Sequence, residues 1–182
     1  EGRNTDAYGF LAHLETSVQD WRDRDGRCVV LGAGGAARAA VVALLDAGAT
    51  ELVIVNRSEE RARALCAELN DRRLSTAGWA DRSAMLRGAA LLVNTTSLGM
   101  VGMPPLEINL SLMTAGGIVY DIVYRPLETS LLRGARQRGL STVDGLGMLV
   151  HQAVPAFEAF FGIRPDVDAD LVCSLRAELE PA

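Results

Sequence analysis

Short runs of apolar residues alternate along the chain with longer segments whose apolar positions recur at helical spacing. Six of these runs have the length of buried strands, and they occupy residues 27–31, 51–55, 72–76, 90–94, 117–123 and 140–144. Most are nearly continuous in apolar side chains, which is typical of parallel strands that are covered on both faces. The run at 72–76 is the weakest of the six.

The segments between these strands carry helix signals at their ends. Helices are expected at 35–48, 58–70 and 127–139. Ser58 provides an N-cap for the second of them, while Gly48 and Gly139 end the first and the third. The alternation predicts an α/β fold, namely a Rossmann-type doubly wound, six-stranded parallel sheet in the strand order 3-2-1-4-5-6.

Helices outside this alternation are expected to flank the sheet at both ends of the chain. Residues 6–21 and 146–162 show apolar positions at helical spacing, and 168–179 forms a further helix. Pro155 lies inside the second of these segments and favours a kink there. The first helix and the 146–162 helix are expected to lie together at the open side of a cleft.

The glycine-rich segment after the first strand carries the clearest functional signal. Gly32, Gly34 and Ala37 match the pattern G-x-G-x-x-G/A directly between a strand and a helix. The first glycine permits a tight turn, and the second lets the backbone approach a pyrophosphate at the N-terminus of the helix. The residues expected to bind the pyrophosphate of a dinucleotide are Gly32, Ala33, Gly34, Gly35 and Ala36.

The end of the second strand indicates which dinucleotide binds. An NAD site usually has an acidic residue there, which binds the adenosine ribose. This chain has Asn56 and Arg57 instead, followed by Ser58 and, one helical turn later, Arg61. Guanidinium groups and a hydroxyl can hold the 2′-phosphate of NADP by charge-assisted hydrogen bonds. NADP is therefore the expected cofactor, and a solvated arginine in a loop is the alternative.

Composition narrows the functional classes further. A net charge of −5 offers no broad basic surface for nucleic acid. All 18 basic residues are arginine, so the chain contains no lysine. Cys28, Cys66 and Cys173 lie far apart without metal-like spacing, which favours free, mostly buried thiols in a cytoplasmic protein and predicts no metal site. No apolar run indicates a membrane span, and no signal peptide is indicated.

Several stretches resemble shikimate dehydrogenases, in the order that this family has them. They are GRNTDAYGF, LGAGGAARA, VNRS, NTTSLGM, DIVYRPLETSLL and DGLGMLVHQAVPAFEAFFG, and together they cover nearly the whole chain. The family reduces 3-dehydroshikimate to shikimate with NADPH, on a path to aromatic amino acids, and has a substrate domain before its Rossmann domain. The resemblance implies a connecting helix from a missing N-terminal substrate domain at 1–21, an NADP-binding Rossmann domain at 22–145, and C-terminal helices packing at the cleft at 146–182.

The resemblance also assigns roles to single residues. It implies that Asp6 is catalytic, pairing with a lysine and binding a substrate hydroxyl, and that Arg57 and its neighbours hold the phosphate of NADP. Substrate-binding residues would be Thr5, Asp6, Tyr124 and Gln152. Further cofactor-binding residues would be Asn94, Thr95, Thr96 and Ser97 in the loop after the fourth strand, with Ile122, Gly145 and Met148 near the nicotinamide.

Taken from the residues alone, several of these positions have simpler interpretations. Thr5 and Asp6 can cap the first helix, and Tyr124 can be a surface aromatic. Gln152 can be an ordinary helix residue. His13 and His151 have no partner spacing that supports a metal or acid–base role, so both are expected to be exposed or packing residues.

The substrate half of such an active site is expected to be incomplete. The family's substrate domain supplies paired serines, an asparagine and the catalytic lysine, and none of those motifs occurs in this lysine-free chain. Hydride transfer to a ketone leaves an alkoxide that needs a proton or a cation, and Asp6 alone is a poor donor. The expectation is the cofactor-binding part of a shikimate dehydrogenase, inactive alone. The alternatives are a stand-alone NADP-binding sensor or interaction module, and a quinate/shikimate dehydrogenase.

Overall fold

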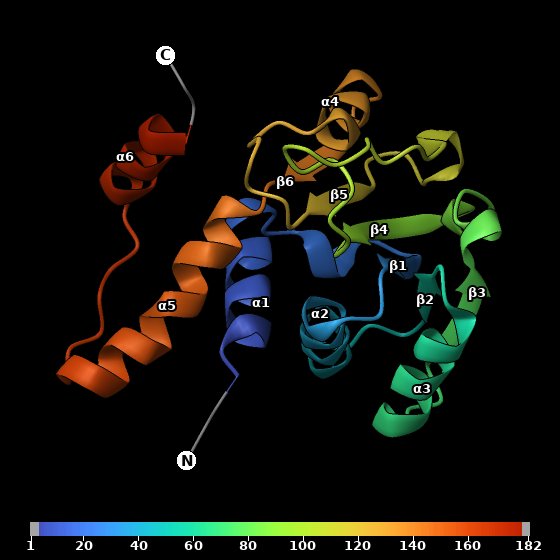
Figure 1. Cartoon of the computed structure of the whole chain (residues 1–182), viewed down its shortest axis with the longest axis horizontal. Helices are drawn as coiled ribbons and strands as arrows, with labels where there is room; N and C mark the ends of the chain where they lie inside the picture. Colours follow the sequence, from blue (N-terminus) through green and yellow to red (C-terminus); the bar gives the residue numbers. More distant parts are fainter. Residues whose placement is uncertain (1–3, 180–182) are drawn as a thin grey trace.

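A single parallel sheet organises the chain (Figure 1). The structure, a computed structural model, describes residues 4–179, so the expected ranges 1–21 and 146–182 lie partly outside it. The strands run in the order β3-β2-β1-β4-β5-β6, with every neighbouring pair parallel. They are β1 (Arg27–Leu31), β2 (Leu52–Asn56), β3 (Leu74–Gly78), β4 (Ala89–Asn94), β5 (Ile118–Asp121) and β6 (Ser141–Val143). The predicted fold class and strand order are confirmed.

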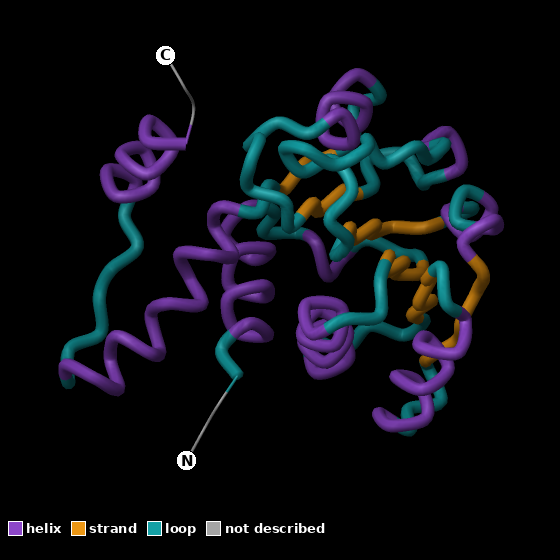
Figure 2. The backbone as a smooth tube through the Cα atoms, in the orientation of Figure 1, coloured by secondary structure: helices purple, strands orange, loops and turns teal. Residues whose placement is uncertain are grey.

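Helices lie on both faces of this sheet, as Figure 2 shows. They are α1 (Asp6–Ser17), α2 (Gly35–Asp46), α3 (Glu59–Leu69), α4 (Ser130–Gln137), α5 (Leu146–Phe161) and α6 (Ala169–Leu179). Short 3-10 turns cover Trp21–Asp23, Trp79–Asp81, Ala84–Leu86 and Leu110–Leu112. In residues 4–179, no helix is both long enough and apolar enough to cross a membrane.

Alternation along β1 divides the core into two layers. Val30 points into the layer that contains the apolar residues of α1, α2 and α3. Val29 and Leu31 point into the opposite layer, which contains those of α4 and of the irregular segment between β4 and β5. All three side chains are fully buried. A strand covered on both faces in this way explains why its sequence is a continuous apolar run.

Helix α1 belongs to this core and also packs tightly on α5. Phe10 is fully buried and stacks on Tyr120 of β5, with ring centroids 4.7 Å apart. A Cβ at Gly9 would lie 2.7 Å from the Gln152 Cβ of α5, so the two helices approach at a glycine. The predicted pairing of the first helix with the 146–162 helix is confirmed, and α5 continues through Pro155.

Several element boundaries and one burial expectation differ from the sequence-based prediction. Helix α4 covers Ser130–Gln137 rather than 127–139, and strand β5 ends at Asp121 rather than at 123. Helix α1 ends at Ser17, short of the expected residue 21. Trp21 is buried, with 7% exposure, but it lies in the 3-10 turn that follows the helix. Strand β3 begins two residues later than the expected 72–76, and its residues at the sheet edge are only partly buried. Of the three free cysteines, Cys28 alone is buried, since Cys66 is half-buried and Cys173 is exposed.

Candidate cofactor-binding site

The turn after β1 meets the end of β4 at the carboxyl edge of the sheet. Gly32 donates its N–H to the Val55 carbonyl over 2.8 Å, and Thr95 Oγ1 donates to the Leu31 carbonyl over 2.6 Å. Gly32 has φ +114°, and a Cβ there would lie 2.5 Å from Thr95 Oγ1. Only glycine fits this position, because both the backbone conformation and the neighbouring hydroxyl exclude a side chain.

The N-terminus of α2 is open toward solvent at this edge. Gly34 is its N-cap and provides no side-chain cap, and the first turn contains no acidic residue. A Cβ built on Gly34 or Gly35 would meet nothing within 4 Å. The first N–H groups of α2 therefore have no intrahelical acceptor, and they present a partial positive charge to any anion that enters.

A cavity of about 300 Å³ lies in front of this helix terminus. Eight expected cofactor residues line it, from three separate strand ends: Gly32, Ala33, Gly34, Asn56, Arg57, Thr95, Thr96 and Ser97. Four further residues complete the wall, namely Trp79, Leu98, Met103 and Pro104. The lining holds one arginine and no carboxylate, so an anionic ligand would meet only attractive charge.

Arg57 is the charged residue of this cavity. Its side chain is exposed, and among residues 4–179 it takes part in no ion pair. Asn56 Nδ2 donates to the Ser58 carbonyl over 2.9 Å, which fixes the turn between β2 and α3. Ser58 is the N-cap predicted from the sequence, since its Oγ accepts the Arg61 N–H over 3.4 Å. Ser58 and Arg61 lie beside the cavity and are not part of its lining.

Asn94 holds the loop after β4, which lines the cavity, by hydrogen bonds to Thr96 and Leu98. This side chain is fully buried at the end of β4 and is absent from the cavity lining. Its Oδ1 accepts hydrogen bonds from the Thr96 N–H at 3.1 Å and the Thr96 hydroxyl at 2.7 Å. Its Nδ2 donates to the Leu98 carbonyl at 3.2 Å and to Asp121 Oδ1 at 2.9 Å. All the hydrogen-bonding capacity of the amide is used within the chain, so Asn94 shapes the loop and has no group left for a ligand.

Asp121 is the buried acid that completes this network. Besides Asn94, its carboxylate accepts the Val123 N–H at 3.1 Å and the Thr129 hydroxyl at 2.7 Å. Burial raises the pKa of Asp121 to about 6, although the hydrogen bonds from Thr129, Val123 and Asn94 act in the opposite direction. Nothing in the sequence pattern distinguished this acid from a strand-end residue. The network joins the ends of β4 and β5 to the N-cap of α4.

The three residues expected near the nicotinamide form a second group, where the segment after β5 meets the start of α5. Gly145 donates its N–H to the Val123 carbonyl over 3.3 Å. A Cβ at Gly145 would lie 2.1 Å from the Ile122 carbonyl oxygen, so the close approach requires glycine. Met148 follows on the first turn of α5 and is 7% exposed. These residues do not line the 300 Å³ cavity.

Comparisons with known proteins agree with this architecture. Residues 14–100 match the family described as Shikimate / quinate 5-dehydrogenase, and residues 145–170 match the Shikimate 5'-dehydrogenase C-terminal domain. A curated relative named Shikimate dehydrogenase (NADP(+)), from Rhodospirillum rubrum, is 55% identical over 92% of this chain. The chain belongs to the shikimate dehydrogenase family.

Solved structures of the family superimpose closely on the chain. Quinate dehydrogenase from Corynebacterium glutamicum in complex with NAD has a TM-score of 0.83 at 32% identity, covering 97% of this chain and 61% of that one. Shikimate 5-dehydrogenase from Thermus thermophilus in complex with NADP(H) and shikimate has a TM-score of 0.78 at 35% identity, covering 98% and 64%. The chain spans about 60% of the length of the Rhodospirillum rubrum relative.

The residues that the family resemblance places at the substrate lie on α1, α5 and the segment after β5. Gly9 of α1 contacts Gln152 of α5. Asp6 lies one turn before Gly9, so Asp6 and Gln152 are on two helices that pack against each other. Thr5 occupies the N-cap position of α1 without a side-chain cap, and Asn4 Oδ1 accepts the Asp6 N–H over 2.7 Å instead. The capping role considered for Thr5 is therefore wrong.

Tyr124 lies in a segment that is joined to the loop after β4. Its side chain is 38% exposed, on the segment that follows β5. The Val101 N–H donates to the Arg125 carbonyl over 2.9 Å, which joins this segment to the loop after β4. Tyr124 is thus a surface aromatic by exposure, as the simpler interpretation has it, and it lies in a segment attached to the loop that lines the cavity.

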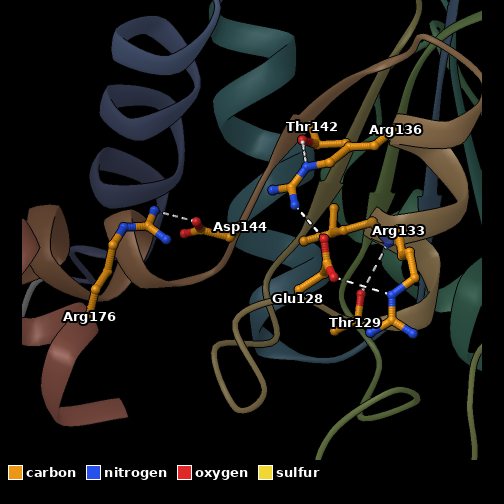
Figure 3. Close-up of polar contacts among 8 residues, drawn as sticks. Glu128, Thr129, Arg133, Arg136, Thr142, Asp144 and Arg176 are labelled. Atoms are coloured by element: carbon orange, nitrogen blue, oxygen red, sulfur yellow. Dashed lines mark hydrogen bonds and ion pairs between the residues drawn. The ribbon is translucent and has the colours of Figure 1, made fainter. Parts of the chain in front are cut away.

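His13 is largely buried, with 14% of its side chain exposed, in a polar cluster that the sequence did not reveal. Its Nε2 lies 3.8 Å from Asp144 Oδ1, and its ring packs edge-on against Tyr120 at 5.8 Å between centroids. Arg176 of α6 donates to the other oxygen of Asp144, as Figure 3 shows. Burial alone would raise the pKa of Asp144, but the nearby His13 ring and the hydrogen-bonded Arg176 outweigh it and lower this pKa to about 2. This cluster attaches α1 and α6 to the end of β6.

Proposed function

We propose that residues 1–182 form the NADP-binding part of an enzyme that reduces 3-dehydroshikimate to shikimate. One observation carries the proposal. The cavity at the carboxyl edge of the sheet combines an uncapped helix N-terminus with Arg57 and has no carboxylate in its lining. A dinucleotide with an extra phosphate matches this charge pattern. The curated relative at 55% identity is named Shikimate dehydrogenase (NADP(+)), which supports the choice of cofactor and reaction.

The glycine turn leaves room for the pyrophosphate of the cofactor. Open space in front of Gly34 and Gly35 gives a pyrophosphate access to the first N–H groups of α2. Arg57 would hold the 2′-phosphate, with Asn56, Ser58 and Arg61 beside it. Bound NADPH supplies the hydride. Ile122, Gly145 and Met148 would border the nicotinamide end, beyond Thr95 and Ser97.

Substrate binding is proposed for one wall of the cleft. Asp6, Thr5, Tyr124 and Gln152 would face the substrate from α1, the segment after β5 and α5. Asp6 would accept a hydrogen bond from a substrate hydroxyl and would hold a cationic partner in place. The groups that bind the substrate carboxylate and protonate the alkoxide are proposed to come from a substrate domain outside these 182 residues. Shikimate is proposed over quinate because the curated relatives are named for it.

Two measurements on the same sample test this proposal. The 182-residue chain should bind NADPH in a calorimetric titration, and it should not reduce NADP+ when shikimate is added, because positioned acid–base groups and substrate orientation each contribute large rate factors. A protein that joins these residues to a family substrate domain should oxidise shikimate, and Asp6→Asn in it should slow turnover without changing NADPH affinity. Failure to bind NADPH would contradict the cofactor assignment. Turnover by the 182 residues alone would contradict the half-site assignment.

A further inference from the structure

Trp79 is the first residue after β3, and it stands beside Arg57 at the carboxyl edge of the sheet. In the register of β2 and β3, Asn56 pairs with Gly78. The next residue on each strand end is therefore Arg57 on one side and Trp79 on the other. Both side chains line the 300 Å³ cavity. A ligand group bound by Arg57 would therefore lie close to the indole ring of Trp79, at the end of the adjacent strand.

One face of this indole is already covered by a fixed cation. The Arg82 guanidinium carbon lies 5.2 Å from the centroid of the Trp79 ring. Its Nη1 donates to the Trp79 carbonyl over 2.9 Å, and its Nε donates to the Glu107 carbonyl over 2.8 Å. These bonds hold Arg82 against the ring and restrict the rotation of the indole. Trp79 also packs in part against the apolar layer that contains α4, and it contributes to the lining of the cavity.

The cavity combines polar and apolar lining. The glycine turn, the α2 N-terminus and Arg57 are its polar part. Trp79, Met103 and Pro104 contribute apolar surface. In a 2′-phosphorylated adenosine, the phosphate and the base are attached to one ribose, so a phosphate on Arg57 places a flat aromatic base within one sugar of it. Stacking on an indole is sequence-tolerant and strong for such bases.

We propose that Trp79 forms the adenine subsite, where the base of the cofactor stacks on the indole and Arg82 supports the opposite face. This inference rests on the proposed function, because it concerns the same cavity and the same cofactor. It assigns the base to Trp79 and the 2′-phosphate to Arg57, so the two residues should affect affinity in different ways. Loss of the indole should weaken every ligand that contains adenine, whether or not it has a 2′-phosphate.

The test uses the 182-residue chain and three probes: NADP+, NAD+ and adenosine 2′,5′-bisphosphate. Trp79→Ala should lower the affinity for NADP+ and for the bisphosphate by about 5- to 150-fold, the range of base–aromatic stacking. NAD+ affinity should fall by the same factor, so the preference for NADP+ over NAD+ should stay constant. Trp79→Phe should stay within about 3-fold of the unmutated chain, and Trp79→Leu should resemble Trp79→Ala.

Tryptophan fluorescence distinguishes stacking on Trp79 from a general effect of the substitution on the fold. The chain has two tryptophans, and Trp21 is buried outside the cavity. Adenosine 2′,5′-bisphosphate should quench fluorescence in the unmutated chain and should lose this effect in Trp79→Phe. If the unmutated chain binds NADP+ and all three Trp79 variants bind equally well, the adenine subsite is refuted while the proposed function stands. If the unmutated chain binds no NADP+, the proposed function itself is refuted.

Discussion

The side-chain amide of Asn94, at the end of β4, donates a hydrogen bond of 2.9 Å to the buried carboxylate of Asp121, at the end of β5. Both side chains are fully buried, so neither can exchange its partner for water. The same amide holds Thr96 and Leu98 of the cavity loop. The shape of the candidate cofactor site therefore depends on a residue pair that lies beneath it.

Removal of this amide should cost both stability and cofactor affinity. Asn94→Ala leaves the Asp121 carboxylate and the Leu98 carbonyl each without one partner, and we expect a loss of about 2–3 kcal/mol in the free energy of unfolding. Urea denaturation measures the loss, and NADPH titration should show weaker binding because the loop is no longer held. Ser97→Ala, at an exposed position of the same loop, should change the unfolding free energy by less than about 0.5 kcal/mol. Equal stability of the two variants would contradict the network.

Asp121 should make stability depend on pH in a defined window. Burial raises its pKa from 3.8 to about 6, so the folded chain holds this proton more tightly than the unfolded chain. The stabilising contribution is complete below about pH 4 and is lost as pH rises through about 6, by roughly 3 kcal/mol. Asp121→Asn does not titrate. The unfolding free energy of the unmutated chain, relative to this variant, should fall between pH 4 and pH 7. A constant difference across that range would count against the raised pKa.

Substitutions at two glycines of the turn should distinguish an effect on stability from an effect on ligand binding. Gly32→Ala places a Cβ 2.5 Å from Thr95 Oγ1 at φ +114°, and it should destabilise the fold by about 2–4 kcal/mol. A Cβ at Gly34 meets nothing within 4 Å, so Gly34→Ala should leave the melting temperature nearly unchanged. It should weaken NADPH binding, since the new methyl group enters the space proposed for the pyrophosphate. Unchanged NADPH affinity in Gly34→Ala would place the pyrophosphate elsewhere.

The ion pair between Arg176 and Asp144 should hold α6 against the body of the protein (Figure 3). Arg176 is about 41% exposed, so the pair should stabilise this attachment by only about 1 kcal/mol. Arg176→Ala should accelerate amide hydrogen exchange in α6 several-fold and leave exchange in the central strands unchanged. Arg138→Ala, at an exposed position of the α4 C-cap, serves as the control. Because the pKa of Asp144 is about 2, this stabilisation is present above about pH 4 and lost as pH falls through 2.

The sequence predicted the sheet well because most of its strands are covered on both faces. Continuous apolar runs such as Arg27–Leu31 are visible without any knowledge of tertiary contacts. Strand β3 lies at the sheet edge, where side chains are half-buried and the pattern is weak, and its prediction was two residues off. The sequence predicts a longer α1 because Trp21 continues the helical spacing of apolar residues. In the structure, Trp21 is buried from the 3-10 turn after the helix, and periodicity does not distinguish these two placements.

The candidate site could be predicted only in part, because some of its residues are fixed by contacts between segments that are far apart in the sequence. Motif spacing located the glycine turn and Arg57, since those residues are defined by their place after a strand. Trp79 was missed because β3 was expected to end at residue 76, although a large aromatic directly after a strand end is a usable signal. Asn94 was predicted as a ligand residue, but its amide is occupied by Asp121, Thr96 and Leu98. Such pairings between distant segments leave no local pattern.

The most direct test of the cofactor assignment compares NADP+ and NAD+ binding by the unmutated chain and by Arg57→Ala. Loss of a charge-assisted contact to the 2′-phosphate should weaken NADP+ binding by about 10- to 150-fold and leave NAD+ binding nearly unchanged. Arg63→Ala is the matched control, because Arg63 is an exposed arginine of α3 paired with Glu59, and it should alter neither affinity. The account predicts that calorimetry will show a preference for NADP+ that disappears with Arg57. Equal binding of the two cofactors by the unmutated chain would contradict it.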